Sequence, residues 1–179
     1  MRRCRLASMS LSGAMANLIT IICCLGTGIG VLACRSPRPD ARWQQMNEGA
    51  IYEAALSDLL EAPADWDEGQ SRATCVCLGD DVGDCHDPDA ALLGRLQARH
   101  FDVFGKSACT FDQQGSVRLK GTKAVIVGVG KAQWGVDANF VKVLGWRYIG
   151  YVSGAQWTYR LSRRDGRWSV DGAKVESIS

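Results

Sequence analysis

Apolar residues follow three patterns along the chain. A nearly continuous apolar stretch at 18–32 comes first. Between 51 and 60 the apolar side chains recur every three or four residues, as one buried face of an α-helix requires. In the last third of the chain, apolar and polar residues alternate, which is typical of half-buried β-strands. The pattern predicts an apolar leader, then helical structure, then a sheet.

Two helices are predicted from their end signals. Asp40 can cap the first helix, because its short side chain can accept from the free amides of the first turn, and Pro63 marks the end. The pair Asp87-Pro88 indicates the start of a second helix. Asp87 would be the cap, and Pro88 would take the first helical position, where its missing N–H costs nothing. We expect this helix to end near His100.

The remaining segments predict strands. The Asp165-Gly166 pair indicates a two-residue hairpin, because both turn positions need positive φ. Helices followed by an antiparallel meander give an α+β layout. The expected strands are 74–78, 117–119, 123–129, 137–144, 156–162, 167–170 and 175–178, with 147–154 ambiguous.

The helix at 51–60 and the hairpin from Tyr159 to Val170 resemble parts of the NTF2-like, or cystatin-like, α+β roll. The resemblance covers that helix and the last third of the chain, whereas the middle segment around Val76 does not match. It implies N-terminal helices packed on a curved antiparallel sheet. NTF2-like enzymes use Asp, His or Tyr inside the cone to move protons next to a carbonyl. Here Tyr52, Asp137 and Tyr159 are the corresponding pocket candidates.

The leader has the parts of a signal sequence. Three arginines, Arg2, Arg3 and Arg5, precede the apolar stretch, and no further charged residue occurs before Arg35. The chain is therefore divided into a signal peptide or membrane anchor at 1–34, a Pro-containing tether at 35–42 and one domain at 43–179. The leader's basic end is expected in the cytoplasm and the domain outside it.

The leader allows three outcomes. The segment Val31-Leu32-Ala33-Cys34 resembles a bacterial lipobox, which makes Cys34 the candidate for lipidation. The same stretch, counted back through Ala14, is just long enough to remain as a transmembrane helix, which needs about twenty apolar residues. An ordinary cleaved signal would instead give a secreted protein. The chain also looks like small uncharacterised bacterial envelope lipoproteins, so we expect a membrane-anchored domain facing the periplasm or exterior.

The charge of the domain gives no reason to expect nucleic acid as a partner. The chain carries 21 Lys+Arg and 19 Asp+Glu. Without the three leader arginines, 18 basic residues face 19 acidic residues, so the rest of the chain is nearly neutral. Nucleic-acid binding needs a concentrated basic face.

Four cysteines remain outside the leader and the lipobox: Cys75, Cys77, Cys85 and Cys109. An even set in an exported domain predicts disulfides, and three pairings are open. Residues two apart on a strand point to the same face, so Cys75 and Cys77 are expected to bond to the other two cysteines and not to each other. Zinc would need His86 as well, and the spacing does not fit a zinc knuckle.

Two charged clusters are candidate binding sites. Five aspartates lie between 80 and 89, but their spacing is not that of a helix-loop-helix calcium site, so we expect a solvated loop and no metal. Four arginines lie close together at the last hairpin, namely Arg160, Arg163, Arg164 and Arg167. They could bind an anionic head group or a partner protein, or they could simply be the solvated tip of the hairpin. No dinucleotide motif is complete, and no cofactor is expected.

These observations favour a non-catalytic envelope domain that binds a small ligand or a protein partner, because no complete catalytic set is present. The first alternative is an NTF2-like enzyme of isomerase or dehydratase type with a buried acid or base. The second is a structural or interaction lipoprotein.

Overall fold

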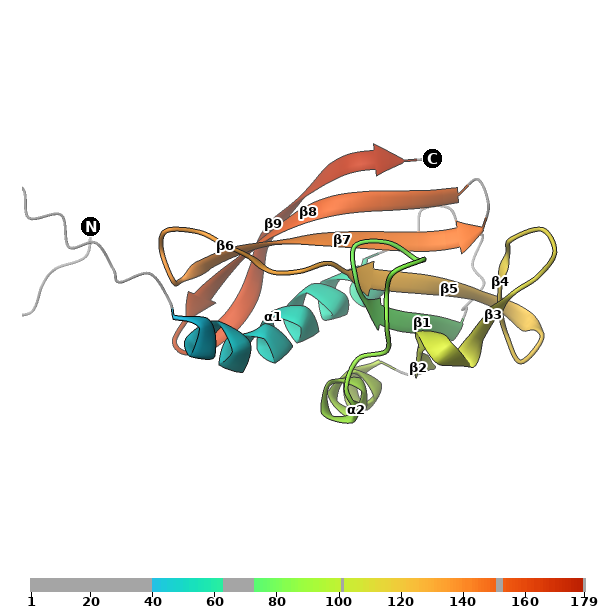
Figure 1. Ribbon diagram of the computed structural model, residues 1–179, viewed down its shortest axis with the longest axis horizontal. Coiled ribbons are helices and arrows are strands. Elements are labelled where there is room, and N and C mark those ends of the chain that lie inside the picture. The colour runs from blue at the N-terminus through green and yellow to red at the C-terminus, as the bar shows by residue number, and fades with distance from the viewer. Residues whose placement is uncertain (1–39, 63–72, 101, 151–152, 179) are drawn as a thin grey trace, which may run out of the picture. The chain divides into compact units, whose positions relative to one another are not determined.

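The computed structural model describes residues 40–62, 73–100, 102–150 and 153–178 (Figure 1). These form a mixed α+β domain with two helices and a large, mostly antiparallel, uncurled sheet. The leader and Cys34 lie outside the described residues, so the division at 34 and the lipidation stay predictions. Among the described helices, none is both long and apolar enough to span a membrane.

The first helix agrees with its sequence signals, and the second begins later than expected. Helix α1 (Ala41–Glu61) is capped by Asp40, whose carboxylate accepts from the Trp43 amide at 2.7 Å. It starts inside the range expected for the tether. Helix α2 (Ala90–Arg99) is capped by Asp89 and not by Asp87. The Asp87 carboxylate accepts from the Ser107 amide instead, so a tertiary contact takes the residue that the local sequence assigned to a cap.

The central strands follow the order β2-β1-β5-β7-β8-β9. Strands β5 (Thr122–Val129), β7 (Phe140–Gly150), β8 (Ser153–Arg164) and β9 (Arg167–Ile178) form the expected meander. The prediction of a purely antiparallel sheet is wrong at β1 (Ala73–Leu78), which runs parallel to both β5 and β2 (Val103–Gly105). Helix α2 connects β1 to β2, and a helical crossover returns the chain for parallel pairing.

Two strands are longer than predicted. Strand β7 includes most of the strand expected at 137–144 and continues into the first part of the ambiguous segment 147–154, whose residues 153 and 154 belong to β8. Strand β9 covers both expected strands, 167–170 and 175–178. The hairpin between β8 and β9 is confirmed, with φ of 51° at Asp165 and 80° at Gly166. Short elements complete the domain: η1 (Lys106–Ala108), β3 (Cys109–Phe111), β4 (Val117–Leu119) and β6 (Gln133–Trp134).

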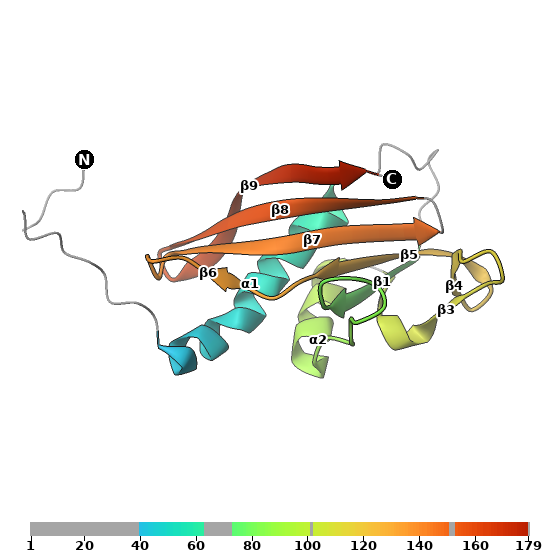
Figure 2. The same ribbon diagram turned by 45° about the horizontal axis from the view of Figure 1, so that its top comes forward.

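Both helices pack on one face of the sheet (Figure 2). A single apolar core lies between the helices and the strands, because alternate residues of each strand point toward that side. Tyr159 fills the space under α1, where a Cβ on Gly145 would overlap its ring. The largest buried side chains of this core include Ile51, Leu56, Leu59, Leu92, Leu96, Val127, Tyr159 and Leu161.

The opposite face of the sheet has a smaller core without helices. There Ile126 and Trp146 pack with three cysteines under the 79–86 loop and the short β3–β4 hairpin. Both cysteines of β1 point to this face, as the alternation along the strand predicts. The described part of the sheet therefore has a helix-covered face and a disulfide-bonded face.

Candidate functional site

A hollow of about 510 Å³ lies where β6 meets β7, beside the end of the disulfide-bonded face. Its size falls in the range of small-molecule sites. Strand β6 and the turn after it supply one wall, β7 supplies the other, and β8 adds one side chain. The lining residues are Gln133, Trp134, Gly135, Phe140, Val141, Lys142 and Arg160.

Two cations stand side by side in this hollow. Lys142 on β7 and Arg160 on β8 are directly opposed across the antiparallel pair, and both are exposed. Like charges in this position repel and destabilise a sheet. The Glu176 carboxylate pairs with Lys174, whose Nζ lies 3.2 Å away, and it also interacts electrostatically with Lys142. The pKa of Glu176 is held below its ordinary value, first by its hydrogen bond with Lys174. The hollow therefore has an excess of positive charge.

Aromatic side chains give the same hollow an apolar component. Phe140 is 43% exposed, although large apolar side chains of β7 are otherwise mostly covered. Trp134 is half-buried and packs edge-to-face on Trp43 and Trp168, with ring centroids 5.3 and 5.7 Å away. Asn47 on α1 accepts from the Trp168 indole at 3.1 Å. The tryptophan wall is thus fixed from α1 and β9 before any ligand binds.

Asp137, one of the three pocket candidates, shapes the turn next to the hollow and does not line it. Its carboxylate accepts from the backbone and side-chain amides of Asn139 at 2.9 and 3.0 Å. Its carbonyl accepts from the Phe140 amide at 3.1 Å. Asp137 therefore holds the turn that presents Phe140.

Tyr52 and Tyr159, the other two candidates, have separate neighbours. Tyr52 on α1 lies near the Ala132 backbone, and burial, followed by the charge of Glu48, raises its phenol pKa. Tyr159 is buried in the core, and its pKa is raised first by burial and then by the nearby Asp58 carboxylate. None of the hollows found among the described residues, at β6 and β7, beside α1 and β9, or next to Trp146, is lined by Tyr52, Asp137 or Tyr159.

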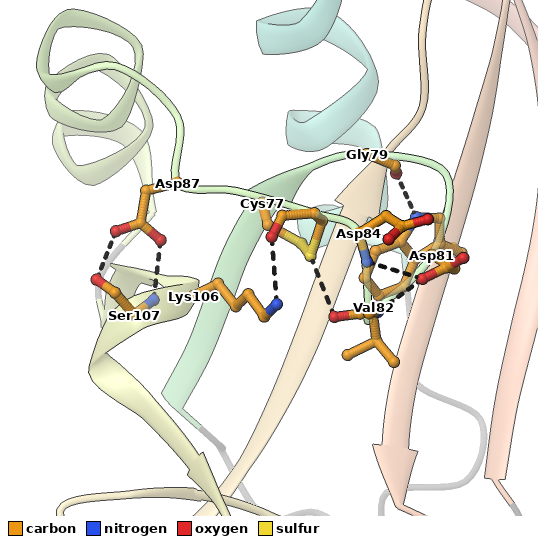
Figure 3. The surroundings of a disulfide bond; sticks show 11 residues. Cys77, Gly79, Asp81, Val82, Asp84, Asp87, Lys106 and Ser107 are labelled. Atoms are coloured by element: carbon orange, nitrogen blue, oxygen red, sulfur yellow. Dashed lines mark hydrogen bonds between the residues drawn. A yellow bond between two sulfur atoms is a disulfide. The ribbon is translucent and has the colours of Figure 1, made fainter.

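The disulfide prediction is confirmed. Cys75 bonds to Cys109 and Cys77 bonds to Cys85, with Cα–Cα distances of 6.4 and 5.6 Å. Figure 3 shows the second bond with Lys106 beside it, whose ammonium donates to the Cys85 carbonyl at 3.2 Å. These bonds join β1 to the loop and the hairpin that cover the opposite face.

The aspartates around this disulfide bind local donors, as Figure 3 shows for Asp81 and Asp87. The carboxylates satisfy separate backbone amides, and they do not converge on a common point. Within the described ranges, no group of acids, histidines and cysteines could hold a metal ion. The bonds run from Lys131 to Asp80, from Gly83 and Asp84 to Asp81, from Ser107 to Asp87 and from Leu92 to Asp89.

The glycines that could suggest a phosphate loop have a packing role. A Cβ on Gly128 would overlap the Trp146 ring, and a Cβ on Gly130 would overlap the Asp80 carboxylate. Gly128 needs to be glycine because the buried Trp146 ring approaches its backbone closely, whereas the close neighbour of Gly130 is the movable end of the Asp80 side chain.

The arginines of the last hairpin do not form one patch. Arg160 lines the hollow, whereas Arg163 stacks over Trp43 at 5.4 Å. Arg164 bonds to Asp171 at 2.8 Å, and Arg167 lies in a groove beside α1. Sequence reasoning identified Arg160 but missed Lys142 and Phe140. The only signal for these two was the alternation along β7, which gave no register with β8.

No family model matches this sequence, and neither a curated protein nor a solved structure shows significant similarity to the chain.

Proposed function

We propose that this protein is an exported, membrane-tethered binding domain whose ligand is a small organic anion with an apolar body. The ligand's charged group lies against Lys142 and Arg160, and its apolar part lies against Phe140 and Trp134. The signal-like leader and the two disulfides support export, since disulfides persist in oxidising compartments.

The observation that carries this proposal is the pair Lys142 and Arg160, directly opposed on adjacent strands and next to exposed aromatic surface. A protein tolerates such a repulsive pair at a cost in stability. An anion bound between the two cations would remove the repulsion and add charge-assisted hydrogen bonds. A purely structural sheet surface would gain more from an acid at either position.

Naphthalene-2-carboxylate is a suitable probe, and its uncharged amide is the matched control. Binding to the protein as purified from its producing cells is measured by isothermal titration calorimetry at low salt. We expect the carboxylate to bind at least about tenfold more tightly than the amide, because only the carboxylate pairs with the cations.

Two substitutions test the location. Arg160→Gln is expected to weaken carboxylate binding at least about fivefold, since it removes one charge-assisted partner. Arg164→Gln is the matched control, because Arg164 lies on the same strand but pairs with Asp171. Equal binding of acid and amide, equal affinities in the two variants, or the absence of saturable binding would each refute the proposed function.

The other functions expected from the sequence stay predictions. An NTF2-like enzyme would need a proton-transfer group in an apolar cavity, and the nearest described arrangement is Tyr159 beside Asp58. Turnover of generic isomerase or esterase substrates that is lost in Asp58→Asn would favour the enzyme. An interaction lipoprotein would instead co-purify with a protein partner.

A further inference from the structure

The sheet ends in a long strand with one free edge. Strand β9 pairs with β8 along one side, and no described strand pairs with its other side. Its exposure pattern agrees, since most of its residues are exposed and only Trp168 is buried. Free edges offer unpaired N–H and C=O groups to another chain. The edge is therefore a physical template for one more strand.

A groove of about 680 Å³ runs between α1 and the first half of this strand. Its lining includes no residue of β8, so the groove opens on the free side of β9. The α1 wall contributes small side chains at helical spacing, namely Ala50, Ala54 and Ser57. Such a wall leaves room for the side chains of an added strand, and a groove between a helix and a sheet edge is a recurrent site for peptides bound as strands.

The α1 wall is acidic. Three carboxylates line it, but Glu53 is already paired, with Arg99 at 3.1 Å and also with Arg95. Asp58 makes no ion pair with any described residue, and Glu61 has only His100 at 3.9 Å. Asp58 and Glu61 repel each other, and burial followed by Glu61 raises the pKa of Asp58. A cation delivered by a ligand would relieve this repulsion.

A second feature of the groove is an unsatisfied hydroxyl. Ser57 is only 8% exposed, and its Oγ has no hydrogen-bond partner in the described part of the chain. A buried polar group without a partner costs free energy. Ser57 lies on the groove lining between Ala54 and Asp58. Two arginines also line the groove, Arg99 from α2 and Arg167 at the hairpin end. Because Arg99 is paired with Glu53, the acids that remain for basic side chains of a ligand are Asp58 and Glu61.

We propose that the groove between α1 and the free edge of β9 binds an extended, basic segment of a partner protein, which joins the sheet as a further strand. Main-chain hydrogen bonds to β9 supply affinity, and lysine or arginine side chains facing Asp58 and Glu61 supply specificity. This surface uses none of the residues that line the hollow at β6 and β7, so the two sites can be tested separately.

The test uses fluorescein-labelled octapeptides of alternating Lys and Thr, with alternating Glu and Thr as the charge control. Binding to the full protein is measured by fluorescence polarisation. We expect the Lys peptide to bind at least about tenfold more tightly than the Glu peptide. A Lys peptide methylated on alternate backbone nitrogens is expected to bind at least about tenfold more weakly, because it cannot form all the main-chain hydrogen bonds to β9.

Variants locate the site. The double variant Asp58→Asn, Glu61→Gln keeps the shape of both side chains and removes their charge. It is expected to weaken binding of the Lys peptide at least about fivefold. Glu176→Gln is the matched control, since Glu176 lies at the other end of β9 and outside the groove. Ala54→Trp, checked for native circular dichroism, is expected to abolish binding by filling the groove.

Several results would overturn the proposal. They are equal affinity for the Lys and Glu peptides, undiminished binding of the methylated peptide, and unchanged binding in the Asp58→Asn, Glu61→Gln variant. A concentration-dependent dimer that excludes the peptides would assign the edge to a second copy of the chain. Naphthalene-2-carboxylate binding in the same variants reports on the hollow independently.

Discussion

The two faces of the sheet are stabilised in different ways. On the helix-covered face, α1 and α2 bring long apolar side chains such as Leu56, Leu59 and Leu96 onto the valines of the strands. On the disulfide-bonded face, the covering elements are a loop and a hairpin whose strands have three residues each. Such short elements bury too little apolar area to hold themselves in place, and covalent bonds constrain them instead. The hollow at β6 and β7 is lined from β6, β7 and β8 and includes none of the disulfide-bonded cysteines.

Removal of the Cys75–Cys109 bond is expected to have the largest effect on stability. In the chain-entropy model, a bond that closes a 34-residue separation contributes about 4 kcal/mol, whereas the 8-residue separation of Cys77–Cys85 contributes about 2.6 kcal/mol. The paired variants Cys75→Ala, Cys109→Ala and Cys77→Ala, Cys85→Ala are compared by urea denaturation.

The order of these two losses tests how the disulfide-bonded face is held. If the shorter loop costs as much as the longer one, local packing and not chain entropy holds this face. Unchanged stability in both variants would mean that the disulfides do not stabilise this face of the sheet.

Leu59→Ala tests the helix-covered face and is expected to cost about 3 kcal/mol, through lost burial and the cavity left under α1. Because Leu59 and the Cys77–Cys85 bond lie on opposite faces, their losses should add within about 0.5 kcal/mol. Denaturation of the single and combined variants measures this. Strong non-additivity would mean that the two faces share one cooperative core through β1 and β5.

Asp58→Asn is expected to have the smallest effect on stability of these substitutions, and to stabilise the folded protein. Burial and Glu61 raise the Asp58 pKa in the folded state, so its ionisation opposes folding. Stability from the protonated form is present at low pH and is lost as pH rises through the folded pKa. The variant should therefore melt at a higher temperature than the wild type at pH 7, and the difference should vanish near pH 3.

A matched control for this pH effect is Asp171→Asn. The Asp171 carboxylate accepts from Ser162 and pairs with Arg164 at 2.8 Å, so its neutralisation should lower the melting temperature at pH 7. If both substitutions shift the melting temperature in the same direction, the ion pairing of the acid does not explain the effect of Asp58→Asn.

Local signals in the sequence predicted several elements well. Asp40 and Pro63 bracket α1, Asp165-Gly166 forms the hairpin, and the alternation along β1 placed both of its cysteines on one face. The local helix-cap signal was wrong at Asp87, where a tertiary contact competes with the cap. Asp87 has the sequence of a helix cap, but it binds Ser107, which is brought near by the parallel placement of β2.

The candidate site was less predictable, because it depends on register. Asp137 was one of three candidates for a pocket, and its contacts order the turn beside the hollow. Lys142 gave no signal until its pairing placed it opposite Arg160. A strand's own sequence sets which residues share a face, but only its pairing sets which side chains meet across strands.

The sequence by itself determined the ends of α1, the strand faces, the hairpin turn and the exclusion of cysteine pairing within β1, since each depends on residues close together in the chain. The tertiary structure decided the parallel position of β1, the choice of disulfide partners, the opposed cations of the hollow and the groove beside the free edge of β9. These features join residues far apart in the chain, and their energies exist only once the chain has closed the loops between them.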